Sequence, residues 1–134
     1  MCVGYTAGVY DLFHVGHLRL IQAAAALCDR LIVGVSTDEV AAVKGSRPVI
    51  SETHRMEVLR GIVGVDVVIP QTDFDKVKAH DRLKYDVLFI GDDWYGDDRW
   101  AGYEKTLKER GVDIIYLPYT TEISSTSIIN EIMG

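Results

Sequence analysis

The chain has 134 residues, a length that suits one domain with its own core, and we expect residues 1–134 to form a single domain. Its formal net charge of −6 argues against a general binder of nucleic acids or membrane surfaces, because both of these partners are anionic. The sequence contains two cysteines without C-x-x-C spacing, no apolar run of membrane-spanning length and no signal peptide before the first strand. We therefore expect a cytoplasmic domain, with Cys28 as a reduced, buried thiol.

Short apolar runs alternate with longer amphipathic segments along the chain. The apolar runs predict strands at 3–7, 30–36, 65–70, 85–91 and 112–118. The amphipathic segments predict helices at 17–29, 51–63, 74–83, 98–110 and 124–133. This alternation predicts an α/β fold, a Rossmann-like doubly wound five-stranded parallel sheet of order 3-2-1-4-5 with helices on both faces. Ligands of such sheets bind beyond the carboxyl ends of the strands, so functional residues should follow strands.

The first strand is followed by GVYDLFHVGH, residues 8–17, which leads into the first helix. Unpaired N–H groups at a helix start favour an anion, and His14 and His17 would stand beside that position. Three interpretations fit the residues alone: the imidazoles donate to a phosphate, one caps the helix while the other packs, or the pair binds zinc. His54 and His80 lie on other elements and offer no further zinc ligands nearby.

The second strand is followed by a helix start at 36–38, where Asp38 fits a cap, and then by a loop that contains Lys44 and Arg47. These two cations are either solvated surface groups or a lid over bound phosphates. The next helix has an apolar arc of Met56, Val58, Leu59, Ile62 and Val63. Arg55 falls near the middle of that arc, so it needs either a salt bridge, with Asp66 or Asp38, or a bound phosphate.

The last two strands are also followed by polar residues. Asp92 and Asp93 come directly after the fourth strand, where they fit a turn, a water-bridged metal, or a ribose or base contact. The last predicted helix opens with the hydroxyl-bearing residues Ser124, Ser125 and Thr126. One of these three serves as an ordinary N-cap, and together they suit phosphate oxygens.

The stretch G-V-Y-D-L-F-H-V-G-H resembles the G-T-F-D-x-x-H-x-G-H signature of the nucleotidyltransferase superfamily. A narrower match runs through VGVSTDEV, the Lys44 loop, SETHR, VDVVIP, IGDDW, IYLP and the closing ISSTSI. In that order these segments look like the glycerol-3-phosphate cytidylyltransferases, whose relatives act on choline phosphate and ethanolamine phosphate.

The resemblance implies direct transfer of CMP from CTP to a phosphorylated alcohol, with glycerol 3-phosphate as the first choice. The acceptor phosphate would attack the α-phosphorus in line and pyrophosphate would leave, without a covalent enzyme intermediate. Mg²⁺ would accompany CTP, and a homodimer is implied, with no nucleic acid or membrane as partner. Two alternatives stay open: the same fold using ATP or a sugar or amino-alcohol phosphate, or a nucleotide-binding protein with weakened catalysis.

The resemblance also assigns roles to residues that match the family's motifs. The implied catalytic residues are His14, His17, Lys44 and Arg55. The implied nucleotide-binding residues are Gly8, Val9, Tyr10, Asp11, Gly16, Asp93, Trp94, Tyr119, Thr120, Ile123, Ser124, Ser125 and Thr126. The implied acceptor-binding residues are Asp38, Arg47, Lys76 and Lys78. No side chain is implied as a direct metal ligand.

Two departures from the family pattern remove cations. Tyr119 stands where the family has a phosphate-binding arginine, in Y-T-T-E-I-S-S instead of R-T-E-G-I-S-T. Val63 stands where a second arginine is usual, and Arg60, one turn earlier, is a possible substitute. Each lost charge-assisted contact would cost about 1.5–3 kcal/mol if nothing replaced it. The acceptor is therefore the least constrained part of the prediction.

Overall fold

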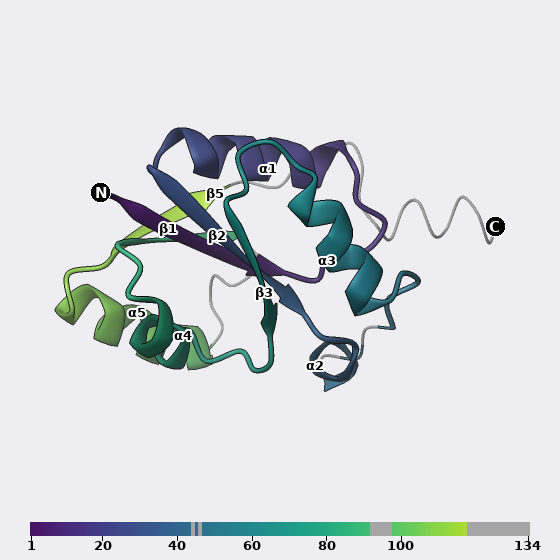
Figure 1. Cartoon of the computed structure of the whole chain (residues 1–134). Coiled ribbons are helices and arrows are strands. Elements are labelled where there is room, and N and C mark those ends of the chain that lie inside the picture. Colours follow the sequence, from purple (N-terminus) through teal and green to yellow (C-terminus); the bar gives the residue numbers. More distant parts are fainter. Residues whose placement is uncertain (44, 46, 92–97, 118–134) are drawn as a thin grey trace.

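The computed structural model of the chain describes residues 1–43, 45, 47–91 and 98–117 (Figure 1). Its strands are β1 (Val3–Gly8), β2 (Arg30–Ser36), β3 (Val67–Gln71), β4 (Val87–Gly91) and β5 (Asp113–Leu117). Its helices are α1 (Val15–Ala26), α2 (Asp38–Val43), α3 (Glu52–Arg60), α4 (Lys76–Leu83) and α5 (Asp98–Glu109). The five strands form one parallel sheet of order β3-β2-β1-β4-β5, which confirms the predicted topology.

The sheet is covered on both faces, as its strand sequences require. Figure 1 shows α1 and α3 on one side of the strands and α4 and α5 on the other. Neighbouring residues of one strand therefore enter different cores: Val33 packs under α1, whereas Ile32 packs on the opposite face. Side chains of successive strand residues point to opposite faces, so both faces must be apolar, and the strand runs read as unbroken apolar segments.

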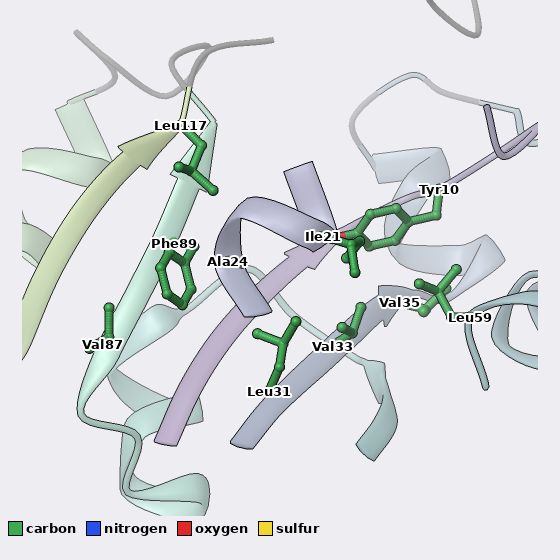
Figure 2. Close-up of a cluster of buried hydrophobic side chains, with 10 residues drawn as sticks. All are labelled: Tyr10, Ile21, Ala24, Leu31, Val33, Val35, Leu59, Val87, Phe89 and Leu117. Atoms are coloured by element: carbon green, nitrogen blue, oxygen red, sulfur yellow. The ribbon is translucent and has the colours of Figure 1, made fainter. Parts of the chain in front are cut away.

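The larger core lies between the sheet and the helices α1 and α3. Figure 2 shows Ile21 of α1, Val33 of β2 and Leu59 of α3 directed toward one another, with Tyr10 from the loop after β1 closing one end of this cluster. Ile21, Val33 and Leu59 are fully buried. This packing anchors α1, and the two histidines lie at the start of that helix.

Aspartates hold the backbone where strands begin. The Asp29 carboxylate accepts from the N–H of Cys2 at 2.6 Å, and the Asp86 carboxylate accepts from the N–H of Val3 at 2.9 Å. The Asp66 carboxylate accepts from the N–H of Leu31 at 2.8 Å. The alternative in which Asp66 pairs with Arg55 is therefore wrong, because Asp66 lies at the amino end of the strands, away from the site.

Some predicted boundaries need correction. The helix predicted at 51–63 ends at Arg60, with Gly61 as its C-cap, so Val63 lies outside it and is 92% exposed. Val58 is 44% exposed, so the predicted apolar arc was too wide. The pattern was misleading because helical periodicity continued past the glycine that ends the helix. The helix predicted at 124–133 lies outside the described residues.

Cys28 is partly rather than fully buried, and neither it nor Cys2 is in a disulfide. Within the described residues, no helix is both long enough and apolar enough to cross a membrane.

Candidate active site

The two histidines form a reciprocal cap at the start of α1. His14 is the N-cap, and its Nδ1 accepts a hydrogen bond from the N–H of Gly16 at 3.0 Å. His17, one turn later, accepts from the N–H of His14 through its own Nδ1 at 3.3 Å. The two rings stack with centroids 4.0 Å apart. A capping box usually pairs Ser or Thr with Glu or Gln, so here imidazoles perform the work of both.

This cap determines which nitrogen of each ring is left for a ligand. A ring nitrogen that accepts from an N–H carries no proton, so neutral His14 and His17 are both protonated at Nε2. The N–H groups of both rings are therefore on the side away from the cap. The helix start adds its own partial positive charge, and together these groups suit a phosphate oxygen. The capping and phosphate interpretations are compatible, because they use different nitrogens of the same rings.

Burial keeps the pair neutral. Burial, and after it the neighbouring charge of His14, lower the pKa of His17 to about 4. Burial also lowers the pKa of His14. A neutral imidazole retains both the cap at Nδ1 and the donor at Nε2, whereas protonation of Nδ1 would break the cap. The site is therefore built around two neutral donors.

The loop before α1 has an unusual backbone. Tyr10 and Leu12 have φ values of 56° and 48°, in the left-handed region that non-glycine residues rarely adopt. Such residues cost about 1–3 kcal/mol each and persist only where the surroundings hold them. Tyr10 is held by the core, and its ring packs edge-on against His17 at 5.5 Å between centroids. Phe13 lies 5.3 Å from the same imidazole.

Asp11, between the two left-handed residues, joins this loop to the segment that precedes α3. Its Oδ2 accepts from the N–H of Val49 at 2.8 Å, and its Oδ1 accepts from the N–H of Ile50 at 2.9 Å. The side chain is 7% exposed. These bonds fix the end of the loop that contains Lys44, and the nucleotide contact of Asp11 stays a prediction.

Arg55 forms four hydrogen bonds through its guanidinium and is only 1% exposed. Its Nε donates to the carbonyl of Ile50 at 2.8 Å, and its Nη1 donates to the carbonyls of Val9 and Ser36, both at 2.7 Å. Its Nη2 forms an ion pair with Asp38 Oδ1 at 2.6 Å. The salt bridge with Asp38, one of the two pairings considered from the sequence, is thus the one that forms.

The contacts of Arg55 favour a positioning role over the direct catalytic role predicted from the sequence. Four of its hydrogen bonds go to protein groups, and almost none of its surface is open to a ligand. We therefore assign Arg55 a positioning role: it holds the ends of β1 and β2 against the start of α3. Asp38, predicted to bind the acceptor, has one carboxylate oxygen in this ion pair.

The other predicted acceptor residues lie at different depths. Lys76, the first residue of α4, is 3% exposed, and its carbonyl accepts from Tyr85 Oη at 2.8 Å. Lys78 is exposed and lines a cavity between β3 and α4, together with Thr72, Asp75 and Arg82. Arg47 is exposed. Because α4 covers the face of the sheet opposite to α1, a ligand that joins Lys78 to the histidines must cross the carboxyl edge of the sheet (Figure 1).

Of the remaining predicted site residues, two glycines lie within the described part of the chain and the others lie outside it. Gly8 ends β1, and a Cβ there would lie 3.2 Å from the Tyr10 ring. Glycine at this position therefore leaves room for the ring to pack against the end of the strand. Gly16 is buried and supplies the N–H that His14 accepts. The residues outside the described part of the chain are Lys44, Asp93, Trp94, Tyr119, Thr120, Ile123, Ser124, Ser125 and Thr126.

Sequence reasoning missed the segment before α3. Val49 and Ile50 act through backbone groups, which Asp11 and Arg55 bind. Backbone partners leave no mark on residue type, so no motif could have revealed them. Phe13 was also missed, since an aromatic residue beside a histidine in sequence reads as ordinary packing.

Comparison with known proteins identifies the family. The model of the cytidylyltransferase-like family matches residues 5–131. The chain belongs to this family. It is 38% identical over 131 residues to the glycerol-3-phosphate cytidylyltransferase of Bacillus subtilis strain 168, covering 96% of this chain and 95% of the relative. It is 42% identical over 125 residues to the enzyme of the same name from Bacillus spizizenii, covering 92% and 91%.

Other proteins that resemble this chain are larger or more distant. The bifunctional protein HldE of Rhodopseudomonas palustris strain HaA2 is 36% identical over 96% of this chain, but the match covers only 26% of that protein. Among solved structures, a lipopolysaccharide core biosynthesis protein of Thermoplasma volcanium superposes with a TM-score of 0.75 at 25% identity, covering 90% of this chain and 97% of that one. A protein from Archaeoglobus fulgidus, at 22% identity and a TM-score of 0.71, shares the fold.

The Arg55 interactions predict a large stability cost for its removal. Arg55→Met keeps an apolar stem but leaves Asp38 and three carbonyls without their partner, so we expect a loss of about 3–5 kcal/mol in the free energy of unfolding. Urea unfolding of the wild type and the variant measures this difference in the free energy of unfolding. Arg60→Met, at an exposed position of the same helix, is the control and should change stability by about 0.5 kcal/mol or less. A loss below about 1 kcal/mol for Arg55→Met would contradict the positioning role.

The lowered pKa of His17 predicts a loss of stability in acid. The unfolded chain binds a proton near pH 6.5 and the folded chain only near pH 4, so stability should fall as the pH drops through this window and be fully present above it. Thermal unfolding across the window measures the change. His17→Asn removes the titrating group and should weaken the dependence, whereas His54→Asn, at an exposed position of α3, should leave it intact. An unchanged dependence in His17→Asn would refute the assignment.

Proposed function

We propose that this cytidylyltransferase transfers CMP from CTP to glycerol 3-phosphate, producing CDP-glycerol and pyrophosphate. The observation that carries the proposal is the pair of Nε2–H donors at the start of α1, in a chain that matches two glycerol-3-phosphate cytidylyltransferases over most of their length. A helix start with two neutral imidazole donors suits a nucleoside triphosphate, because the helix and the imidazoles together direct N–H groups at several phosphate oxygens.

In the proposed reaction, an oxygen of the acceptor phosphate forms a bond to the α-phosphorus of CTP. The bond between the α-phosphorus and the bridging oxygen to the β-phosphate breaks in line, and pyrophosphate carries away the electron pair. No proton moves to or from the histidines, which donate hydrogen bonds from Nε2 to phosphate oxygens throughout. Catalysis then consists of positioning and of stabilising the charge that develops on those oxygens.

The residues around the histidines would hold the reacting groups in place. Asp11 and Arg55 bind the N–H and the carbonyl of Ile50, and so fix the end of the loop that carries Lys44 and Arg47. We propose that Lys44 bridges the acceptor and nucleotide phosphates from this loop, with Lys78 near the acceptor. Asp93, Trp94 and the hydroxyls of 124–126 would complete the nucleotide site.

Magnesium is part of the proposal as a companion of CTP. Within the described residues, no group of three or more His, Cys, Asp or Glu side chains forms a metal-binding set. Mg²⁺ commonly binds substrate phosphates and water with few protein ligands, and we propose that the triphosphate supplies most of its ligands here. We also propose that the enzyme is cytoplasmic and that it forms a homodimer, and the homodimer rests on the resemblance to the family alone.

A second candidate keeps the chemistry and changes a substrate. The match to part of a bifunctional protein shows that this domain also occurs within larger relatives. Tyr119 and Val63, where the family has arginines, point to the same possibility. The alternative acceptors are a sugar phosphate or an amino-alcohol phosphate, and the alternative nucleotide is ATP.

Pyrophosphate release tests the substrates directly. With magnesium, we expect release with CTP and glycerol 3-phosphate to exceed release with ATP, because the chain belongs to the cytidylyltransferase-like family. Choline phosphate, ethanolamine phosphate and a hexose phosphate serve as competing acceptors. Equal or greater release with ATP would overturn the cytidylyl assignment, and preference for another acceptor would replace glycerol 3-phosphate. Binding of CTP without release for every acceptor would favour the weakened-catalysis alternative.

The double use of His14 predicts that its two roles can be separated by substitution. Asparagine is among the best N-caps, so His14→Asn should keep the helix start while removing the Nε2 donor. We expect turnover to fall about 100- to 1,000-fold, as for loss of one charge-stabilising donor, with little change in unfolding free energy. His14→Ala should lose turnover and about 1 kcal/mol of stability. His54→Ala is the matched control, and near-normal turnover in His14→Asn would remove His14 from the mechanism.

A further inference from the structure

The two cysteines lie at opposite ends of the β1–α1 unit, which carries the histidine pair. Cys2 precedes β1, and Cys28 follows α1. Three hydrogen bonds join the backbone of Cys2 to the residues directly after Cys28. The N–H of Cys2 donates to Asp29 Oδ2 at 2.6 Å, and its carbonyl accepts from the N–H groups of Asp29 at 2.8 Å and Arg30 at 3.1 Å. These bonds hold the two ends of the unit side by side.

The side chains share a location as well. Cys28 lies over Gly4, where its Sγ and Cβ would be 2.8 and 3.2 Å from an added Cβ. Cys2 and Gly4 are two residues apart, so in an extended chain both face the same side of the sheet. Cys2 and Cys28 pack against the same core cluster, and both are free and partly buried. Glycine at position 4 leaves the space that Cys28 occupies.

We propose that Cys2 and Cys28 form a reversible intramolecular disulfide when the protein meets a peroxide. The Cys2 sulfur attacks one peroxide oxygen, forming a sulfenic acid and releasing water. The Cys28 sulfur then attacks the Cys2 sulfur, and the sulfenic oxygen leaves as a second water. Two thiols are oxidised to one disulfide, and hydrogen peroxide is reduced to two water molecules.

The order of the two steps follows from the setting of each thiol. Cys28 donates its S–H to the carbonyl of Ala24 at 3.4 Å, and burial raises its pKa. A protonated thiol is a poor nucleophile toward peroxide, so Cys2 reacts first and Cys28 resolves the sulfenic acid. A resolving thiol beside the first cysteine limits further oxidation to the sulfinic acid.

The disulfide would enclose residues 3–27, the segment that contains β1, the histidine loop and α1. Such a cross-link restricts the unfolded chain, and for a loop of this length we expect the melting temperature to rise by about 10 °C. The reduced enzyme needs neither cysteine for the chemistry proposed above, and the proposed function is not required for the disulfide to form.

The test treats the full-length protein with hydrogen peroxide and reads intact mass, thiol alkylation and melting temperature. We expect loss of two hydrogen atoms, no alkylation by iodoacetamide, a peptide linked through Cys2 and Cys28, and reversal by dithiothreitol. Cys2→Ser and Cys28→Ser are the matched controls. Each should lose both the mass change and the rise in melting temperature, while keeping pyrophosphate release in the reduced state.

Three results would overturn the proposal. Sulfinic acids at both cysteines would show that the sulfurs do not meet. A disulfide between two chains, seen on a non-reducing gel, would place the reaction between molecules. Retention of two alkylatable thiols after peroxide, under conditions that oxidise free glutathione, would show that neither sulfur reacts.

Discussion

The guanidinium of Arg55 links segments that the chain order keeps far apart. It binds the carbonyl of Val9 after β1, the carbonyl of Ser36 at the end of β2 and the carbonyl of Ile50 before α3, and its ion pair reaches Asp38 at the start of α2. An arginine suits this role because its fork of N–H donors can serve several acceptors at fixed angles and stays charged. A buried charge is stable only with such partners, so the segments and the side chain hold one another.

The loop between β1 and α1, which Arg55 binds through the carbonyl of Val9, also carries the backbone strain. Tyr10 and Leu12 stand in the left-handed region on either side of Asp11, whose carboxylate binds the two N–H groups before α3. The cost of that backbone is offset by the burial of Tyr10 in the core and by the bonds to Asp11. The result is a rigid support for the first turn of α1, where the imidazoles stack and share the cap. Preorganised donors of this kind stabilise charge without having to move during the reaction.

The sheet topology and the inward position of Arg55 could be predicted from the sequence, because both depend on the pattern of neighbouring residues. Runs of apolar residues without alternation predicted buried parallel strands, and their alternation with amphipathic segments predicted a doubly wound sheet, which the strand order confirms. The inward position of Arg55 followed from its angle on the helix and is confirmed by its burial. The predicted end of that helix was wrong, because the apolar spacing of Ile62 and Val63 continued beyond Gly61, where the helix terminates.

The sequence by itself determined the family, the sheet and the presence of a histidine pair at the start of a helix, since motif and periodicity are properties of neighbouring residues. Only the tertiary structure decided what those residues do. It showed that Nδ1 of each imidazole belongs to the cap, that Asp11 binds backbone near Ile50, and that Arg55 pairs with Asp38. The Arg55 and Asp11 contacts join groups that are far apart in the chain: Arg55 binds the Asp38 carboxylate 17 positions away and the Val9 carbonyl 46 positions away, and Asp11 binds the N–H of Ile50 39 positions away. The backbone partners among these groups leave no trace in residue type.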